Sequence, residues 1–532
     1  MSNSESESSK KPLADTVALP TEAGVRRAWR FRIALMCIAV VALAIRLLQV
    51  NESLWVDELH TSWAVADDWK DVAPRAYIGN QHPLYFWLVR GIVSVAGQSE
   101  FSLRFLSLLS GVGFVVLTGA VARRFTGSEL AGIVAATLVA IDREFIYFSQ
   151  EARTYALVQL LGLIQVCCGY RLLYEAKLRW RFPFVGLSLL LFYLHYTTGL
   201  LLIGELTAAV LLYGTKSYRP KYSTRNLFND FVLIGSISLL TSHDHLSEIL
   251  GRRLNWKSFV TANPRADLIR HFDVYYLASL FALVPATCWR FVSKKPRWIL
   301  LDPLACGLFL IAAVPIGLAW LGTYMESLPI FFYRYLVVLL FVGPLLVAIV
   351  CARLPRPWQI AFTAFVVLFA GYAHGRSTNW WQQGWIVVNR AEDWRSVAGV
   401  VDGQNKDWPV LLQAGFIETN KLIGKHEEIW GEFLSCPLRG IYRIDRADER
   451  LTAGTRNSMV LIKRHEEKLR QTDGGWLVIR SGRDDGMKLA RYLVEYVAFD
   501  IEVITLSGVH VFKLTPSEGP RGRVIEKTPN GT

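Results

Sequence analysis

An acidic pair follows the first apolar run of the sequence. Asp57 and Glu58 stand in LWVDELH at 54–60, where Trp55 precedes them and His60 follows them. A carboxylate that is partly withdrawn from water and lies beside other charges is well suited to act as a general base. An exposed acidic pair at the start of a helix would contain the same residues. The residues alone leave both interpretations open.

Further along the chain, GNQHPLYFWLVR places His82 directly before Pro83. The proline should break the chain before an aromatic, amphipathic helix. His82 can therefore bind a substrate phosphate or cap the turn. Arg104, at the start of the second apolar run, can also bind phosphate, although an arginine at the end of a span often only extends its charged head into the interface.

A second cluster of charges is DREFIYFSQEARTYAL at 142–157, between two apolar runs. Charges at membrane depth usually pair or line a cavity. Arg153 can neutralise a phosphate, because the guanidinium fork matches phosphate oxygens, or it can form a salt bridge with Glu151 or Asp57. Arg334, in FFYRYL, suggests the same chemistry. Two tyrosines beside these arginines complete the candidate substrate-binding residues, Tyr155 and Tyr335.

A third polar segment, SHDHLSEILGRRLNWK, brings His243, Asp244 and His245 close together in sequence. A divalent metal could bind there, but the pattern is weak evidence because neighbouring side chains diverge. A solvated loop near the substrate entrance is the alternative, and no cofactor is certain. Glu205 lies inside an apolar run, where it either belongs to a polar path or pairs within a helix bundle.

These residues must be positioned by membrane helices. Of the 532 residues, 52% are hydrophobic and only 19% are charged, a composition too apolar for a soluble multidomain protein. A helix needs about 20 mainly apolar residues to cross a bilayer. The sequence predicts about eleven such spans, near residues 33–50, 105–122, 128–146, 154–173, 182–197, 199–213, 226–241, 273–291, 299–321, 335–352 and 358–374.

The net charge of +13 is spread over short basic clusters between the apolar runs, which argues against a nucleic-acid partner and for contact with membrane lipids. Lys and Arg accumulate on the cytoplasmic side of a membrane, and every second connector is basic. The pattern predicts a multi-pass protein of the cell membrane with a cytoplasmic N-terminus and an extracytoplasmic C-terminal domain. The basic connectors contain Arg123 and Arg124; Lys177, Arg179 and Arg181; Lys216, Arg219, Lys221 and Arg225; Arg290, Lys294, Lys295 and Arg297; and Arg353 and Arg356.

This topology divides the chain into two ordered modules between two tails. Within the membrane module, the outer loop 51–104 contains LHTSWAVADDWK and LYFWLVRGIVSVAG, which suit helices lying in the membrane interface. A second long outer loop is expected at 242–272. The segments are a disordered cytoplasmic tail at 1–30, the membrane module at 31–376, an extracytoplasmic α/β domain at 385–515 and a disordered tail at 516–532.

The α/β domain is indicated by short β-rich runs that alternate with charged, helical segments. The β-rich runs are VLLQAGF, SMVLIK, GWLVIRSG, DIEVITL and VHVFKL, and the helical segments are HEEKLRQ and RDDGMKLARYLVEYV. No nucleotide-binding glycine motif follows any of these runs, so the sequence assigns no chemistry to the domain.

Taken in order, the motifs resemble the GT-C membrane glycosyltransferases, in the branch of bacterial dolichyl-phosphate-mannose protein mannosyltransferase-like proteins and lipid A aminoarabinose transferases. The resemblance covers residues 40–350 closely and the outer domain loosely. The motifs are WVDE after the first span, HPLYF before the second, SLRFLSLLSG leading into it, SQEARTYAL entering the fourth, RYL entering the tenth and EDWRSVAGVV opening the outer domain.

This resemblance implies a GT-C-like helical bundle whose first outer loop carries the catalytic acid, Asp57, with Glu58 beside it. It also implies a polyprenyl-phosphate sugar donor and an envelope glycan, lipid or protein as the acceptor. The implied reaction is inverting: Asp57 takes the proton from an acceptor hydroxyl, the oxygen attacks the anomeric carbon, and lipid phosphate leaves. The residues that would bind this phosphate are Arg153, Arg334, His82 and Arg104.

The sequence departs from many of these relatives at Ile141-Asp142-Arg143, where they carry a Ser-Pro pair, so this loop could bind a different donor or supply a second acid. Two other functions stay open. A polytopic transporter or lipid flippase would use an intramembrane acid such as Glu205, although the spans show no two-half symmetry. A non-catalytic scaffold would bind an envelope partner through the C-terminal domain and could dispense with Asp57.

Overall fold

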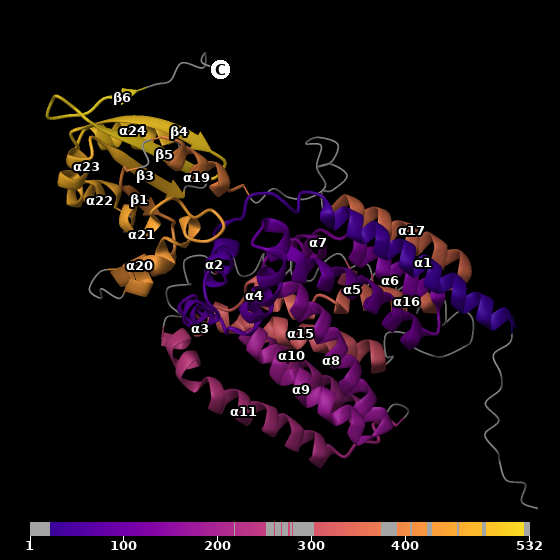
Figure 1. Ribbon diagram of the computed structural model, residues 1–532. Helices are drawn as coiled ribbons and strands as arrows, with labels where there is room; N and C mark the ends of the chain where they lie inside the picture. The colour runs from indigo at the N-terminus through magenta and orange to yellow at the C-terminus, as the bar shows by residue number, and fades with distance from the viewer. Residues whose placement is uncertain are drawn as a thin grey trace, which may run out of the picture.

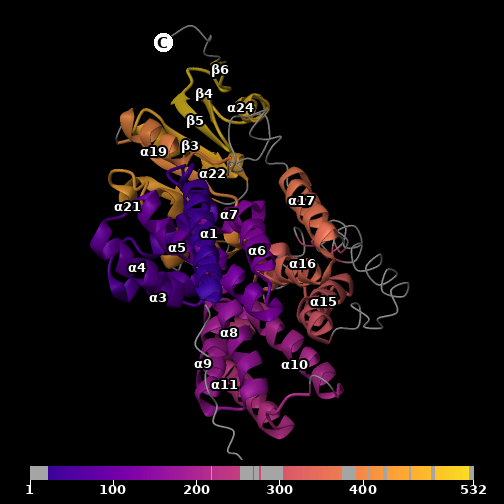
Figure 2. The ribbon, with the colours of Figure 1, turned by 90° about the vertical axis from the view of Figure 1, so that its right-hand side faces the viewer.

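The computed structural model describes residues 22–216, 219–251, 303–373, 391–404, 407–422, 428–454, 457–480 and 486–525, together with residues 260, 268, 275, 276 and 279. The described chain is helical as far as residue 373, and an α/β domain follows from residue 391 (Figure 1). Both views show the α/β domain at one end of the helical bundle (Figures 1 and 2).

The helical part contains long helices joined by shorter ones. They are α1 (Glu22–Leu47), α2 (Val56–Ala64), α3 (Trp69–Ile78), α4 (Leu84–Ala96), α5 (Glu100–Thr126), α6 (Glu129–Ile141), α7 (Arg143–Ser149), α8 (Tyr155–Glu175), α9 (Leu178–Leu194), α10 (Gly199–Tyr213), α11 (Thr224–Gly251), α15 (Pro303–Tyr324), α16 (Val342–Arg353) and α17 (Arg356–Ala373), with 3₁₀ helices at Tyr196–Thr198 and Tyr333–Leu339. α5 packs against α1, α6 and α8, and so connects the early helices of the bundle.

Several of these helices are long and apolar enough to cross a membrane, and the chain is a membrane protein. Within the described residues there are five, or up to six if Tyr333–Leu339 and Val342–Arg353, which meet at 42°, form one bent span. The total of about eleven spans stays a prediction, because 273–291 lies mostly outside the described residues. The five helices are Val25–Leu47, Glu100–Thr126, Tyr155–Glu175, Tyr196–Tyr213 and Leu304–Tyr324.

The predicted span at 128–146 is two helices, α6 and α7, that meet at Asp142. The Asp142 carboxylate accepts hydrogen bonds from the backbone N–H groups of Glu144 and Phe145, and so caps α7. It also accepts from the hydroxyl of Tyr275 at 2.7 Å. Asp142 therefore begins a new helix at the point where the sequence suggested an uninterrupted span.

A buried arginine joins α1 to this break. Arg46 is 0% exposed and donates hydrogen bonds to Ser149 Oγ and to the carbonyl oxygens of Val139 and Ala140. A charge that is fully buried is tolerated only when its donors are satisfied, so Arg46 fixes the C-terminal end of α1 against α6 and α7. Arg46 was not among the residues that the sequence suggested as candidates.

The first outer loop folds into α2, α3 and α4. LHTSWAVADDWK, expected to form one helix, is divided between α2 and α3, because Asp68 and Asp71 form a capping box that starts α3. α2 is largely buried, with Trp63 only 1% exposed. LYFWLVRGIVSVAG forms α4 as expected, and α4 ends at Gly97, which has a φ of 75°. A position of these helices in the membrane interface stays a prediction.

The C-terminal domain contains a mixed six-stranded sheet of order β2-β1-β3-β5-β4-β6. β1 pairs in parallel with β2 and β3, β5 runs antiparallel to β3 and β4, and β6 is parallel to β4. Its strands are β1 (Val410–Gln413), β2 (Leu451–Ala453), β3 (Gly475–Arg480), β4 (Phe499–Leu506), β5 (Val509–Pro516) and β6 (Val524–Ile525). Its helices are α19 (Trp394–Gly403), α20 (Glu428–Leu434), α21 (Ala447–Arg450), α22 (Ser458–Arg464), α23 (Glu466–Gln471) and α24 (Gly486–Val494), with 3₁₀ helices at Ile417–Leu422 and Cys436–Leu438.

Two expectations for this domain are corrected. SMVLIK is not a strand but lies in α22, because the Asn457 side chain caps the helix by accepting from the N–H of Val460. The ordered domain also extends beyond residue 515, because β6 pairs with β4 within the segment expected to be a disordered tail. The other four β-rich runs contain β1, β3, β4 and β5.

The expected outer loop at 242–272 is also corrected. α11 continues to Gly251, so SHDHLSEIL is helical. Leucine and glutamate in this segment favour helix, and no proline or glycine interrupts it before Gly251. Most of the remainder of the segment lies outside the described residues.

Candidate active site

The structure places Asp57 in the first turn of α2, with its side chain 31% exposed. Nη1 of Arg334 donates to Asp57 Oδ2 at 2.8 Å, so the outer loop is joined to the 3₁₀ helix Tyr333–Leu339. Among the described residues this is the one hydrogen bond to the Asp57 carboxylate. The second carboxylate oxygen is therefore available to accept a proton from a substrate.

Arg334 is held in place by an aromatic ring as well as by the carboxylate. Its guanidinium carbon lies 4.4 Å from the centre of the Trp55 ring, in a cation–π contact. Its Nε atom is buried and has no hydrogen-bond partner among the described residues. Arg334 thus orients Asp57 through Nη1, and its Nε–H can donate a hydrogen bond to an anion.

Arg153 approaches the same segment from the turn before α8. Its Nη1 donates to the backbone oxygen of Asp57 at 3.2 Å, and the Gln81 amide oxygen, in its hydrogen-bonded orientation, accepts from the same atom at 3.2 Å. Its Nε is also buried without a hydrogen-bond partner among the described residues. Burial disfavours its charge, but Tyr155 and Asp57 nearby outweigh that effect and raise the pKa of Arg153. Arg153 therefore stays positively charged beside Asp57.

Two further candidates, Tyr155 and Tyr335, both lie near the ring of His195. The ring centres are 5.8 Å apart for Tyr155 and His195, and 5.9 Å for His195 and Tyr335. Both tyrosines are close enough to interact electrostatically with Asp57 and Arg334. The structure therefore gathers five of the predicted residues around one point, namely Asp57, Arg153, Tyr155, Arg334 and Tyr335.

Glu58 and Arg104 form a separate, fully buried ion pair. Nε and Nη2 of Arg104 donate to the two carboxylate oxygens of Glu58 at 2.7 and 2.6 Å, and both side chains are 0% exposed. Glu58 Oε1 also accepts from the N–H of Ala152 at 2.7 Å. Arg104 donates as well to the carbonyl oxygens of Val50 and Glu52. Because both side chains are fully buried and paired with each other, this arrangement favours a role in positioning α2 over direct contact with a substrate.

His82 lies among aromatic rings next to Gln81. The centre of its ring is 4.8 Å from that of Tyr193 and 5.9 Å from that of Tyr77. Its Nδ1 is buried and has no hydrogen-bond partner among the described residues. Burial, and then the nearby His245, lower the pKa of His82 to about 4. At neutral pH His82 can therefore offer a phosphate a hydrogen bond but not a positive charge.

The three side chains of the HDH segment do not converge. His243 and Asp244 are exposed and approach each other, with 3.3 Å between Nδ1 and Oδ1. His245 instead contacts Tyr196, with 2.6 Å between its Nδ1 and the tyrosine hydroxyl. No group of three His, Cys, Asp or Glu side chains in the described part of the chain is arranged to hold a metal ion.

Glu205 pairs with another side chain inside the helix bundle, which is one of the two interpretations that the sequence left open. Its Oε2 accepts from Nε2 of Gln165 at 2.8 Å, and Gln165 also donates to Ser188. Glu205 lines a cavity of about 190 Å³ whose wall is mainly apolar. The cavity also contacts Thr126 and Arg353, at the ends of α5 and α16, so it lies away from Asp57.

Several residues at the site were not among the sequence candidates. Gln81 directly precedes His82 and Trp55 lies two residues before Asp57, so proximity in sequence was a usable signal. His195 is a histidine within an apolar stretch, LLLFYLHYTTGLL, which is a weaker signal. Glu392, described below, lies in EDWRSVAGVV, a motif that was noticed without a role.

Comparisons with known proteins agree with this architecture. The family model described as dolichyl-phosphate-mannose-protein mannosyltransferase matches residues 80–237, a segment that contains His82, Arg104, Arg153 and Tyr155. The structure of ArnT from Cupriavidus metallidurans in the apo state is similar over 92% of this chain and 98% of that one, with a TM-score of 0.50 and 11% identity. No curated protein matches the sequence significantly.

Two other solved structures are similar at slightly lower scores. ArnT from Cupriavidus metallidurans bound to undecaprenyl phosphate has a TM-score of 0.49 and 12% identity, over 93% of this chain and all 100% of that one. The archaeal oligosaccharyltransferase AglB from Archaeoglobus fulgidus, in complex with an inhibitory peptide and a dolichol-phosphate, has a TM-score of 0.45 and 11% identity, over 92% and 75% of the two chains. The segment 80–237 is therefore similar to the dolichyl-phosphate-mannose-protein mannosyltransferase family, and the chain as a whole shares its fold with apo ArnT.

Proposed function

We propose that the chain is an integral membrane glycosyltransferase that moves a sugar from a polyprenyl-phosphate donor to a lipid, glycan or protein of the cell envelope, with inversion at the anomeric carbon. One observation carries the proposal. A partly exposed carboxylate, Asp57, is oriented by Arg334 and lies beside a second buried arginine, Arg153. A base next to two cations is the combination needed to activate a hydroxyl and accept a departing phosphate.

Asp57 is the general base in this proposal. Its carboxylate takes the proton from an acceptor hydroxyl while the hydroxyl oxygen forms a bond to the anomeric carbon. The bond between that carbon and the phosphate oxygen breaks on the opposite side, and the electron pair leaves with the polyprenyl phosphate. A single displacement of this kind inverts the anomeric configuration. Arg334 aims the carboxylate, because it pairs with one oxygen and leaves the other for the substrate.

Arg153 and Arg334 receive the charge that develops on the phosphate. Each has a buried Nε–H without a hydrogen-bond partner among the described residues, and a phosphate oxygen would satisfy it. Cations that are already in place in a poorly hydrated site stabilise developing negative charge more than they would in water. His82, which lies next to Gln81 and therefore near Arg153, adds a neutral hydrogen bond. Tyr155 and Tyr335 line the same region.

The donor is proposed from the family match and from the surroundings of the site. The matched family is described by a dolichyl-phosphate-linked mannose donor, and the matched residues include Arg153. The site lies where α2 and α8 begin, and α8 is one of the helices long and apolar enough to cross a membrane, where a lipid-linked donor would be embedded. The basic connectors support an orientation in which this site and the C-terminal domain face away from the cytoplasm.

Glu58 and Arg104 have a supporting role in this proposal. The pair ties α2 to α5 and, through Ala152, to the turn that carries Arg153. Because the reacting groups must be held to within a fraction of an ångström, a rigid pair directly behind Asp57 contributes to catalysis without contacting the substrate.

The full-length protein in lipid nanodiscs tests this function. It would be incubated with labelled polyprenyl-phosphate mannose, with other polyprenyl-phosphate sugars, and with envelope lipid, glycan or protein acceptors. We expect release of polyprenyl phosphate and a product whose anomeric configuration, measured by NMR, is opposite to that of the donor. Absence of turnover with every donor, together with ion-driven uptake of solute into vesicles, would instead support a transporter.

A further inference from the structure

The C-terminal domain contacts the short segment that leads into α2 and Asp57. The hydroxyl of Tyr442 accepts a hydrogen bond from the N–H of Leu54 at 3.0 Å. Oε2 of Glu392 accepts one from the N–H of Val56, also at 3.0 Å. Val56 directly precedes Asp57 in sequence, so side chains of the C-terminal domain hold the backbone one residue away from the proposed base.

Glu392 connects this backbone to the core of its own domain. The same Oε2 accepts from Nε1 of Trp394 at 2.8 Å, and Oε1 accepts from Nε of Arg480 at 2.8 Å. The Glu392 side chain is only 8% exposed. Trp394 begins α19 and is 0% exposed, while Arg480 ends β3. The carboxylate is therefore fixed from two elements of the domain before it reaches Val56.

All three partners of Glu392 are hydrogen-bond donors. A carboxylate can accept from all of them, because both of its oxygens are acceptors. A glutamine at this position would have to turn its NH₂ group toward at least one donor. The site is thus built for a carboxylate, and not merely for a side chain of this length.

The first turn of α2 needs such an acceptor. The first N–H groups of a helix have no partner inside the helix, and Trp55, at the N-cap position, makes no capping hydrogen bond with its side chain. Glu392 fills this role from another domain, and its negative charge also suits the positive end of the helix. The orientation of the first turn, which carries Asp57, therefore depends on the C-terminal domain.

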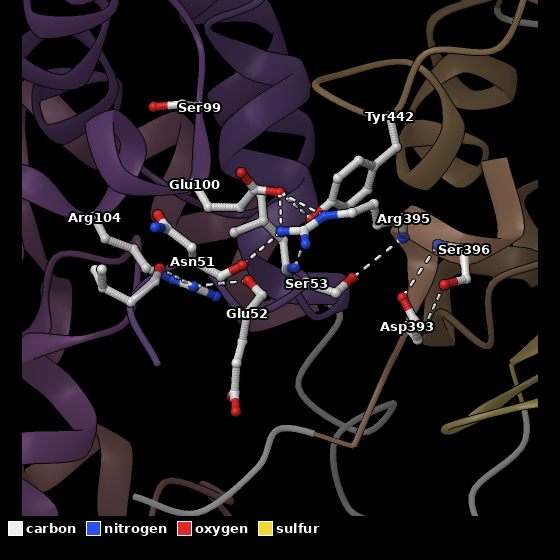
Figure 3. Close-up of polar contacts among 12 residues, drawn as sticks. Asn51, Glu52, Ser53, Ser99, Glu100, Arg104, Asp393, Arg395, Ser396 and Tyr442 are labelled. Atoms are coloured by element: carbon white, nitrogen blue, oxygen red, sulfur yellow. Dashed lines mark hydrogen bonds and ion pairs between the residues drawn. The ribbon is translucent and has the colours of Figure 1, made fainter. Parts of the chain in front are cut away.

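A second group of contacts secures the same segment from its other end (Figure 3). Nη2 of Arg395 donates to the carbonyl oxygen of Asn51 at 2.5 Å and to Glu100 at 2.6 Å. The Tyr442 hydroxyl, which accepts from Leu54, donates to Glu100 at 2.8 Å. Figure 3 shows Arg395 and Tyr442 reaching from the C-terminal domain toward Glu100 and the 51–53 segment. Glu100 begins α5, so both domains meet at this segment.

We propose that Glu392 is a positioning residue of the active site, and that the C-terminal domain acts in catalysis by fixing the first turn of α2. This inference rests on the proposed function, because it assigns Glu392 a role through Asp57. A positioning role differs from simple attachment of the C-terminal domain to the helical bundle, because contacts away from the first turn of α2 could also provide attachment. One such contact is the ion pair between Arg75 and Glu432, at 3.6 Å.

Two variants of the full-length protein test the inference against a matched control. Glu392→Gln changes the acceptor but keeps the size of the side chain, and Tyr442→Phe removes the acceptor of Leu54 but keeps the ring. Glu432→Gln is the control, because Glu432 also joins the C-terminal domain to the outer loop but does not contact residues 51–57. Glu392→Ala would remove all three hydrogen bonds and is informative only if the protein folds.

The first readout is hydrogen–deuterium exchange of a peptide that covers residues 51–58. We expect exchange in this peptide to become about tenfold faster in Glu392→Gln, because a hydrogen bond to a charged acceptor is lost. Tyr442→Phe should also accelerate it, and Glu432→Gln should leave it unchanged. This readout needs no turnover, so it tests the contact even if the chain transfers no sugar. Exchange identical to that of the wild type in both variants would overturn the inference.

The second readout separates kcat from KM. We expect Glu392→Gln to lower kcat about tenfold with little change in the KM for the lipid donor, because a displaced base slows the chemical step more than it weakens phosphate binding. Glu432→Gln should retain the kcat of the wild type. Faster exchange without any loss of kcat would show a structural contact only and would overturn the positioning role. An inactive wild type would count against the proposed function, not against the contact.

Discussion

Arg334 pairs with Asp57, lies over the ring of Trp55 and has a buried Nε–H without a hydrogen-bond partner among the described residues. In the proposed mechanism its charge has two roles: it aims the carboxylate before the reaction, and it stabilises the phosphate as the bond to the sugar breaks. Preorganised donors of this kind act mainly on the transition state. Their loss should therefore be visible in kcat more than in donor affinity.

We expect Arg334→Gln to lower kcat by about 100-fold to 1,000-fold, the range found when one donor to a developing oxyanion is removed. Arg123→Gln is the matched control, because Arg123 also pairs with an acid, Glu129, and lies over the ring of Phe31. Steady-state kinetics of both variants in nanodiscs make the comparison. If both variants have the kcat of the wild type, Arg334 has no part in the reaction.

The buried pair behind Asp57 makes a different prediction. Removing one partner of a buried ion pair leaves an uncompensated charge and typically costs about 3–5 kcal/mol. We expect Glu58→Ala to lower the unfolding temperature strongly, whereas Glu58→Leu combined with Arg104→Met should recover part of that loss. Thermal unfolding in detergent measures both. A Glu58→Ala protein with wild-type stability and no activity would support a direct catalytic role for Glu58 instead.

At the scale of single residues, the sequence suggested Asp57, Arg153 and Arg334 as candidates, from residue type and context and from the resemblance to the GT-C glycosyltransferases. It could not identify what each one contacts. Arg104 follows Glu58 by 46 positions, so no local pattern links the two. The same holds for Asp57 and Arg334, which are separated by 277 positions. Which of such distant residues contact each other depends on tertiary packing, and tertiary packing cannot be derived from the pattern of residue types alone.

Among the elements, α2 is the one on which most of the site depends, and one glycine allows the C-terminal domain to approach it. A Cβ atom added at Gly440 would lie 2.4 Å from Ser62 Oγ and 2.9 Å from the backbone nitrogen of Trp63. The adjacent N–H of Ile441 donates to Ser62 Oγ at 2.7 Å. Any side chain at position 440 would separate the loop from α2 and disturb this hydrogen bond.

We therefore expect Gly440→Ala to destabilise the protein by about 1–3 kcal/mol, as overpacking does, and to lower kcat together with stability. Gly431→Ala, in α20 of the same domain, is the control, because a Cβ there meets nothing within 4 Å. Thermal unfolding and turnover of the two variants would be compared. Equal behaviour of Gly440→Ala and the wild type would show that the close approach to α2 does not matter.

Sequence periodicity predicted helices better than strands. The apolar runs that lie within the described residues are helical, but SMVLIK forms part of α22, because the capping Asn457 lies outside the apolar run that suggested a strand. The HDH segment was expected to be a loop, whereas it continues α11 without a breaking residue. Asp142 divided a predicted span because a carboxylate at that position satisfies the first N–H groups of α7. Each difference lies at a helix cap or at the end of an element, where a single polar side chain can determine where a helix begins or ends.

At the scale of the whole molecule, the sequence predicted a membrane bundle followed by an α/β domain, because composition changes abruptly between them. The GT-C fold rested on the order of several weak motifs, and the shared architecture with apo ArnT confirms it. The dependence of α2 on the C-terminal domain could not be predicted. It is made of hydrogen bonds such as Glu392 to Val56, which join residues 336 positions apart.

We propose that the spans and the C-terminal domain together hold Asp57 as the base of a sugar transfer. A comparison of Asp57→Asn with Asp67→Asn tests this role of Asp57 most directly. Asp67 is also an acid of the outer loop paired with an arginine, Arg75, at 2.8 Å, but it lies outside the site. The measurement is the rate of polyprenyl phosphate release from a labelled donor in a single turnover, with donor binding measured in parallel.

A general base typically contributes about 100-fold to 10,000-fold to the rate. We predict a loss of that size in Asp57→Asn with donor binding retained, because Arg153 and Arg334 are unchanged, and wild-type release in Asp67→Asn. Release at the wild-type rate in Asp57→Asn would contradict the account.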